Sequence, residues 1–287
     1  MTDPKLPPAP PISDAKLPPA PSAVAELTSA VLSGNHGPEP AGLSITSAFW
    51  LHNTTRLPGA DVTYRNYYVL LRVGEVFGAC AFESDEVDPS YCADTSGRTV
   101  ADVLRSDDPL PIRIAALDAY LAAVEPHHTA DAHEIVLPAG TPDVRARARD
   151  AAVAGLLDVA AGTKVALIGV VNPLVDAITE RGGTCLPCDF NLRETASGLP
   201  VSRDMLEVVD QADAVVATGM TLSNGSFDIL LSRCREQAKP LAIYAQTGSA
   251  VARAFLGSGV TALSAEPFPF SQFSARPTSL YRYRIDE

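Results

Sequence analysis

The spacing of apolar positions changes near residue 140, and this change divides the chain into two kinds of structure. Before it, runs rich in aromatic and β-branched residues predict strands at 45–51, 61–73 and 76–82. The short link at 73–75 predicts a hairpin between the second and third of these strands. Helical spacing predicts helices at 22–33, 99–105 and 109–124. This part is therefore predicted to be α+β, with a small antiparallel sheet and helices after it.

After residue 140 the pattern alternates between helices and continuous apolar strands. A long helix is predicted from Thr141-Pro142 to about residue 161, because proline is favoured in a first helical turn. Strands are then predicted at 164–171, 184–190, 213–219, 240–246 and 260–264. The helices between them are predicted at 173–183, 204–211, 226–237 and 249–259. Continuous apolar strands alternating with helices predict an α/β fold, a Rossmann-like, doubly wound parallel sheet.

Proline and glycine mark the predicted domain boundaries. Residues 1–21 form a proline-rich tail in which KLPPAP occurs twice, at 5–10 and 16–21. Proline lacks a backbone donor and fixes φ, so we expect a disordered tail that favours polyproline II. Docking of the tail to a partner's aromatic groove is an alternative. The polar link that breaks at Pro138 and Gly140 places the two domains at 22–138 and 139–287.

Composition narrows the classes of partner. With 22 Lys and Arg against 34 Asp and Glu, the formal charge is −12, which argues against nucleic acid and anionic membranes. The longest apolar run, at 165–171, is too short to span a bilayer. The first residues lack a basic segment followed by an apolar one, so we expect a cytoplasmic protein. Five cysteines in such a protein predict free thiols, and the sequence does not decide self-association.

Polar residues gather at the turns that follow the predicted parallel strands, where such sheets bind ligands. The third turn is the richest, in the segment TGMTLSNGSFDILL at 218–231. Unpaired backbone N–H groups at a helix start, together with hydroxyl and amide side chains, suit a carboxylate, phosphate or other oxygen-rich ligand. The candidate binding residues in the four turns are Gly169 and Asn172; Asp189 and Asn191; Thr218, Gly219, Thr221, Asn224, Gly225 and Asp228; and Gly248 and Ser249.

A nucleotide-type cofactor is the alternative ligand for the same edge. Asp189 lies 20 residues after Gly169, where a dinucleotide-binding sheet places a carboxylate on ribose hydroxyls. The glycine fingerprint is absent, because Val171 and Leu174 occupy the later glycine positions. Pro173 also removes a backbone N–H from the helix start.

Three groups of residues are candidates for metal binding. Oxygen donors from Asp189, Asn224 and Asp228 would favour a hard or borderline divalent ion. Cys185 and Cys188 have C-x-x-C spacing, but residues three apart in a strand point to opposite faces, so we expect buried thiols. The polar link contains a group of ligand-type side chains that a solvated linker also collects: His127, His128, Asp131 and His133.

The third-turn motif resembles that of a known family, the putative heavy-metal-chelation family, a Rossmann-like domain family of unknown function. Its T-G-x-T-L-x-N-G-x-x-D pattern is matched by Thr218, Gly219, Thr221, Leu222, Asn224, Gly225 and Asp228. The segments VALIGVVNPLVDAI, CDFN and TGSAVARAFLGSGVTAL around it also resemble the family. The segment at 97–120 resembles the family's enolase N-terminal-like companion domain, with Arg113 near the place of a basic residue. The proline-rich tail and the Cys185/Cys188 pair lie outside the pattern.

The resemblance covers about residues 22–270 and implies a ligand between the two domains. We therefore predict a protein that binds a metal ion or metal chelate, or that takes part in making a chelator. The rival hypotheses are an enzyme with a nucleotide-type cofactor and a scaffold recruited through the KLPPAP repeats. The sequence identifies no catalytic residue and no single ligand.

Overall fold

The antiparallel sheet is the first half of the architecture. The computed structural model describes residues 21–56, 63–156 and 159–285, so nearly all of the proline-rich tail lies outside the described residues. The sheet has the order β1-β2-β3 and consists of β1 (Ile45–Thr55), β2 (Tyr64–Val73) and β3 (Val76–Phe82). Val73 pairs with Val76 across the expected hairpin. The three predicted strands are thus present, and β1 continues four residues beyond its predicted end.

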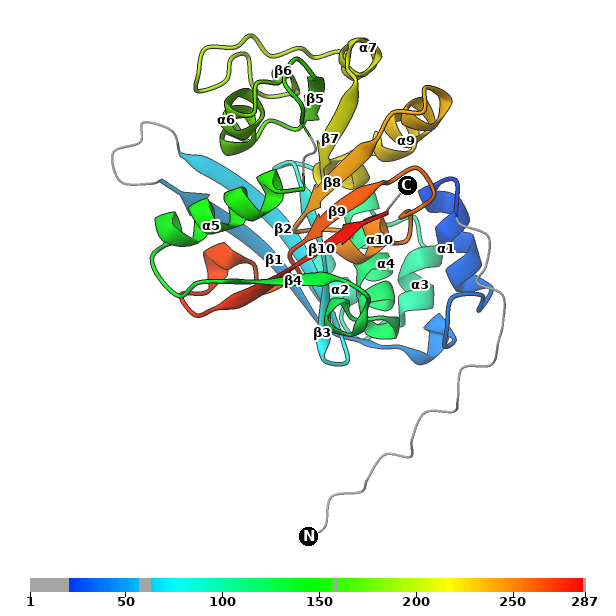
Figure 1. Ribbon diagram of the computed structural model, residues 1–287. Coiled ribbons are helices and arrows are strands. Elements are labelled where there is room, and N and C mark those ends of the chain that lie inside the picture. Colours follow the sequence, from blue (N-terminus) through cyan, green and yellow to red (C-terminus); the bar gives the residue numbers. More distant parts are fainter. Residues whose placement is uncertain (1–20, 57–62, 157–158, 286–287) are drawn as a thin grey trace.

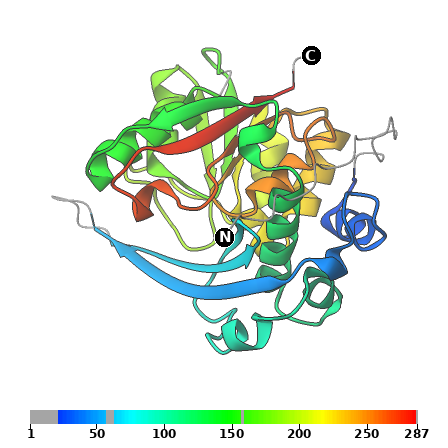
Figure 2. The same cartoon turned by 90° about the horizontal axis from the view of Figure 1, so that it is seen from below.

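Helix α4 lies between this sheet and the C-terminal helices, as Figure 2 shows. It is buried on nearly every side because it packs against β2 and β3 as well as α8 and α10. A methyl group at Gly78 of β3 would lie 2.0 Å from the backbone nitrogen of Ala119, so glycine allows this close approach. The helices of this part are α1 (Val24–Leu32), α2 (Tyr91–Thr95), α3 (Val100–Arg105) and α4 (Leu110–Val124), with short 3-10 turns at Pro40–Gly42 and His127–Thr129.

A seven-stranded sheet forms the second half (Figure 1). Its order is β4-β10-β9-β8-β7-β5-β6, and the last five of these strands are parallel. Strand β10 lies antiparallel to both β4 and β9. The strands are β4 (His133–Leu137), β5 (Lys164–Ile168), β6 (Thr184–Cys188), β7 (Ala214–Thr218), β8 (Leu241–Ala245), β9 (Ala262–Ala265) and β10 (Thr278–Arg284). The five parallel strands were predicted, whereas β4 and β10 were not, and β4 precedes the expected domain boundary.

Both faces of the parallel strands are covered, which explains their continuous apolar runs. On one face Leu167 and Val216 pack with residues of α5 and α6. On the other face Ala166 and Ile243 belong to a core that also includes Leu117 of α4, so one core continues across both halves. The helices of the second half are α5 (Pro142–Ala154), α6 (Asn172–Glu180), α7 (Met205–Gln211), α8 (Met220–Ser223), α9 (Phe227–Glu236) and α10 (Ser249–Arg253).

The strand order creates a crevice at the carboxyl ends of β5 and β7. The chain leaves β5, crosses to β6 on one side and then returns to β7 on the other side. Doubly wound sheets bind ligands at such a reversal of strand order. Among the helices of the described ranges, none has the length and apolar character that crossing a membrane requires.

Candidate functional site

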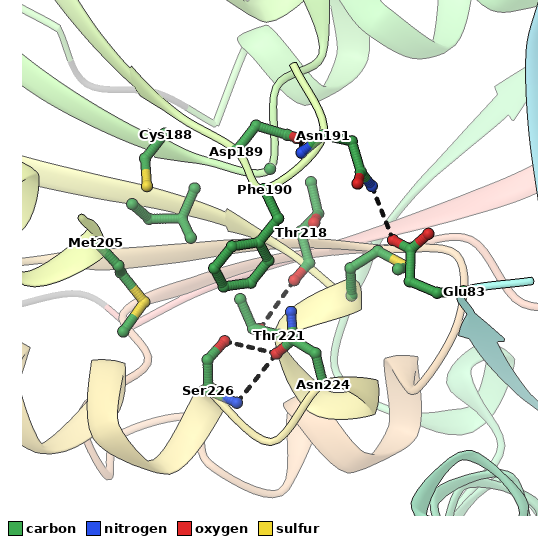
Figure 3. A pocket seen from close by; sticks show the side chains of 13 residues that line it. Glu83, Cys188, Asp189, Phe190, Asn191, Met205, Thr218, Thr221, Asn224 and Ser226 are labelled. Carbon is green, nitrogen blue, oxygen red and sulfur yellow. Dashed lines mark hydrogen bonds between the residues drawn. The ribbon is translucent and has the colours of Figure 1, made fainter. Parts of the chain in front are cut away.

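A pocket opens at this reversal, where the ends of β5, β6 and β7 meet (Figure 3). Its volume is about 510 Å³, including the mouth that is open to solvent. The first half of the chain contributes one lining residue, Glu83, directly after β3. The full lining is Glu83, Ile168, Gly169, Cys188, Asp189, Phe190, Asn191, Met205, Thr218, Met220, Thr221, Asn224 and Ser226.

Gly169 and Thr218 lie against each other in the lining of the pocket. Gly169 has φ +81°, and a methyl group there would lie 2.4 Å from Thr218 Oγ1. Glycine is therefore required for two reasons, the left-handed conformation and the close approach of β7. The hydroxyl of Thr218 has no hydrogen-bond partner among the described residues, so it remains free to bind a ligand.

Asp189 holds two neighbouring turns together. Its Oδ2 accepts a hydrogen bond from the Val170 backbone N–H at 3.0 Å. Its Oδ1 accepts from the N–H groups of Asn191 and Leu192 at 2.8 and 3.1 Å. Both carboxylate oxygens thus already accept hydrogen bonds from the backbone, although a carboxylate has about four acceptor sites in all.

The third turn contains a one-turn helix, α8, in place of the loop expected from its small polar residues. Thr221 Oγ1 donates to the Thr218 carbonyl at 2.9 Å. Asn224 Oδ1 accepts from the Ser226 N–H at 3.0 Å and from its hydroxyl at 2.7 Å. Gly225 has φ +76° between the two helices. Many of the hydroxyl and amide groups therefore build the turn, and the Asn224 Nδ2 amide is left without a partner within the described chain.

The mouth of the pocket is closed on one side by a contact between the two halves of the chain. Asn191 Nδ2 donates to Glu83 Oε1 at 3.0 Å. Phe190 beside it is 58% exposed, and its ring projects between Met205 and Thr218 (Figure 3). An exposed aromatic ring over a small pocket can stack on, or cover, a bound organic group.

Cys188 contributes a thiol to the wall of this pocket. Burial, with the nearby charges of Asp189 and Asp204, raises its pKa to about 11. Cys185 packs on the opposite face of β6, as expected for residues three apart, and all five cysteines are free. The C-x-x-C pair therefore does not form one site.

Several predicted binding residues lie away from the pocket. Asn172 Oδ1 accepts from the Ala196 N–H at 2.9 Å, within the loop after β6. Gly219 donates its N–H to the Tyr244 carbonyl, and a methyl group there would lie 2.4 Å from the Thr247 carbonyl oxygen. These two residues contribute to the folding of the edge, because no pocket-lining atom comes from either.

The fourth turn, expected to bind the ligand through Gly248 and Ser249, is filled by the protein itself. Asp118 of α4 is 3% exposed, and its Oδ1 accepts from the Ala250 N–H at 2.8 Å. Its Oδ2 accepts from the Ala79 N–H at 2.9 Å. Burial raises the pKa of Asp118 to about 6, although the backbone hydrogen bonds lower it. An internal carboxylate thus takes the place expected for a ligand.

Asp228 also lies outside this pocket, apart from Asp189 and Asn224. Its Oδ1 accepts from the Val24 N–H at 2.9 Å, at the start of α1. Helix α1 has no side-chain cap of its own, so Asp228 supplies one across the two halves. Gly225 and Asp228 instead line a second hollow beside α1, together with Arg113.

The histidine-rich link does not gather into a metal site in the described part of the chain. His127 Nδ1 lies 2.7 Å from the Tyr283 hydroxyl, and its Nε2 lies 3.1 Å from Ser249 Oγ. Burial and the nearby Arg253 and His128 lower its pKa to about 3. Within residues 21–56, 63–156 and 159–285, no three His, Cys, Asp or Glu side chains are placed to hold a metal ion.

Sequence reasoning missed part of the pocket lining. Glu83, Phe190 and Ser226 were not candidates, nor were the thioethers of Met205 and Met220. Phe190 and Ser226 directly adjoin candidate residues, so the turn pattern could have included them. Glu83 gives no such signal, because only the tertiary fold brings the end of β3 to this edge.

Comparison with known proteins finds a family similarity for part of the large sheet. Residues 152–265 match the model of the family described as DUF364, putative heavy-metal chelation. The match covers the part of the large sheet from β5 to β9. None of the functionally curated proteins matches the chain.

Two solved DUF364 structures of unknown function extend the similarity beyond residues 152–265. A protein from Desulfitobacterium hafniense DCB-2 is 15% identical with a TM-score of 0.59, covering 91% of this chain and 97% of its own. One from Pyrococcus horikoshii is 15% identical with a TM-score of 0.53, covering 83% and 94%. At 15% identity these two structures show a shared fold and not a shared pocket.

Proposed function

We propose that the pocket between β5 and β7 binds a metal ion already held by a small chelator. The observation that carries this proposal is the position of the pocket at the reversal of strand order, with residues from both halves around it. The DUF364 family name, which refers to heavy-metal chelation, supports the same ligand class.

The donor groups favour a chelate over a bare ion. A structural metal site usually needs three or four protein ligands, and no three His, Cys, Asp or Glu side chains converge in the described ranges. The lining still offers single donors of several kinds, among them Thr218, Asn224 and Cys188. A chelator would supply most of the metal ligands, and the pocket would bind the organic part and one open position of the metal.

A nucleotide-type cofactor is the second candidate, favoured by the position of Asp189 at the end of β6. The hydrogen bonds of Asp189 count against it, because both oxygens already accept backbone N–H groups. Pro173 at the start of α6 also removes an N–H that a pyrophosphate would use.

Native mass spectrometry of the purified full chain tests this proposal. The protein would be measured as isolated and after incubation with Zn²⁺ or Ni²⁺, each alone and as the citrate complex. We expect an added mass that includes both metal and chelator. Thr218→Val should reduce this occupancy, because it removes only a hydroxyl that has no partner in the described chain. Thr184→Val, at the exposed amino end of β6, is the matched control.

Three results would contradict the proposal. An added mass matching a nucleotide would favour the cofactor-using enzyme. Binding of metal–citrate that is equal in the wild type and Thr218→Val would place the ligand elsewhere. If no added mass is seen under any of these conditions, the proposal that the pocket binds a metal chelate is contradicted.

A further inference from the structure

A second polar cluster lies at the carboxyl ends of β8 and β9, on the face covered by α5. Tyr244 is the fourth residue of β8 and pairs with Thr218 of β7 and Ser264 of β9. Gln246 and Glu266 follow β8 and β9 directly. None of these residues except Thr218 lines the pocket described above.

The acceptor groups of the cluster are satisfied within the protein. Glu266 is fully buried, and its Oε2 accepts from Gln246 Nε2 at 2.7 Å, while its Oε1 accepts from the Ser271 N–H. Gln246 Nε2 also donates to Gln272 Oε1 at 2.9 Å. Gln272 Nε2 in turn donates to the Tyr68 hydroxyl at 3.3 Å, which joins β2 to the cluster.

Two donor groups of Arg149 and Tyr244, in contrast, have no partner among the described residues. Arg149 donates Nε and Nη2 to Asp150 Oδ1 at 3.0 and 2.9 Å, which leaves Nη1 without a hydrogen bond among the described residues. Tyr244 is 9% exposed, and its hydroxyl also has no partner there. Neither atom is among the fully buried side-chain atoms that lack a partner in the described ranges, so both remain accessible to a ligand.

The charge states of these two residues make both of them donors at neutral pH. Burial lowers the pKa of Arg149, but its interactions with Tyr244, Asp150 and Glu266 more than offset this effect, so the net pKa is raised. Burial raises the pKa of Tyr244, although Arg149 lowers it. Arg145, one turn before Arg149 on α5, donates from Nε to the Ser271 carbonyl at 3.0 Å, and the Ser271 N–H binds Glu266, so this side of α5 lies beside the cluster.

We propose that this cluster binds the carboxylate group of a small ligand through Arg149 Nη1 and the Tyr244 hydroxyl. The free groups are donors, so the complementary ligand atom is an acceptor oxygen. Asp150 already offsets the charge of Arg149 and Glu266 lies close by, so a singly charged carboxylate fits better than a doubly charged phosphate. This site is separate from the chelate pocket and does not depend on a metal.

Titration of the full chain with propionate, followed by NMR chemical shifts, tests the proposal. We expect saturable binding with a Kd of about 1–10 mM, in the range of small single-group ligands. Arg149→Gln and Tyr244→Phe should each weaken it about tenfold or more, the loss typical of a charge-assisted hydrogen bond. Arg147→Gln, on the exposed side of the same helix, should bind propionate like the wild type.

Several outcomes would overturn the proposal. No saturable shift with propionate, or unchanged affinity in Tyr244→Phe, would show that the cluster is structural. Inorganic phosphate that binds as tightly as propionate would refute the carboxylate assignment. If Arg149→Gln fails to fold, the conservative Tyr244→Phe decides the matter. Loss of propionate binding in Thr218→Val as well would show that the two sites are not separate.

Discussion

Asp118 accepts a hydrogen bond from the backbone N–H of Ala250 at 2.8 Å and thereby joins α4 to the start of α10. The two residues lie 132 positions apart in the sequence, in different halves of the chain. Since the same carboxylate also accepts from Ala79, it fixes β3, α4 and α10 together. The carboxylate therefore acts as a structural joint between the two halves.

We predict that Asp118→Asn destabilises the protein even though it removes a buried charge. An amide has only one acceptor oxygen, so its NH₂ group would face either the Ala79 or the Ala250 N–H. A buried donor without an acceptor should cost about 1–3 kcal/mol, measured by urea unfolding at pH 7. An unchanged free energy of unfolding would show that the Asp118 contacts contribute nothing.

Asp118 should also make the stability of the wild type depend on pH. The native pKa of Asp118, about 6, lies above its usual value of 3.8, so the native state holds this proton more tightly. The contribution of Asp118 to stability therefore falls by about 3 kcal/mol in total as pH rises through 3.8 and 6, with about 2 kcal/mol of this between pH 4 and 6, and is nearly constant above about pH 7. The difference in unfolding free energy between the wild type and Asp118→Asn isolates this slope from that of His127. A difference that does not vary over this range would contradict it.

Gly169→Ala should destabilise the protein more than a comparable change at Gly162. Both glycines have positive φ, +81° and +88°, so alanine costs about 1–2 kcal/mol at either site. Only Gly169 faces a close neighbour, because Thr218 Oγ1 would lie 2.4 Å from the new methyl group, which should add about 1–3 kcal/mol. Thermal unfolding of both variants measures the difference. Thr218→Ala in the Gly169→Ala background should recover part of the loss, and equal Tm values for the two single variants would rule out the steric explanation.

Asp228→Ala should loosen α1 without affecting the chelate pocket. The change removes the acceptor of the Val24 N–H, and loss of a helix cap costs about 1 kcal/mol. Amide hydrogen exchange at Val24 should become faster, whereas Asp131→Ala, at an exposed position, should leave it unchanged. Reduced occupancy of metal–citrate in Asp228→Ala would instead support the metal role expected from the sequence.

Hydrophobic patterning predicted the five parallel strands, because buried strands covered on both faces leave long apolar runs. The turn chemistry of Gly169, Asp189, Thr218 and Asn224 also pointed correctly to the edge where the pocket lies, although their role in binding stays a prediction. The local pattern could not reveal that Asp118 fills the fourth turn, or that Glu83 contacts Asn191 in the second, since both contacts come from distant segments. Strand β10 was missed although Leu280, Tyr281 and Tyr283 favour a strand, because its arginines broke the apolar run.

Strand β10 also sets a limit on when the large sheet can assemble. It lies between β4, which ends at Leu137, and β9, which begins at Ala262, so these two strands are connected within the sheet only through residues 278–284. During translation, β5 to β9 can pair as they leave the ribosome, but β4 must wait until this segment has emerged. Until then, β9 presents an open edge, the kind of surface through which nascent chains associate wrongly. The synthesis of this protein thus includes an interval in which chaperone protection of one strand edge would matter most.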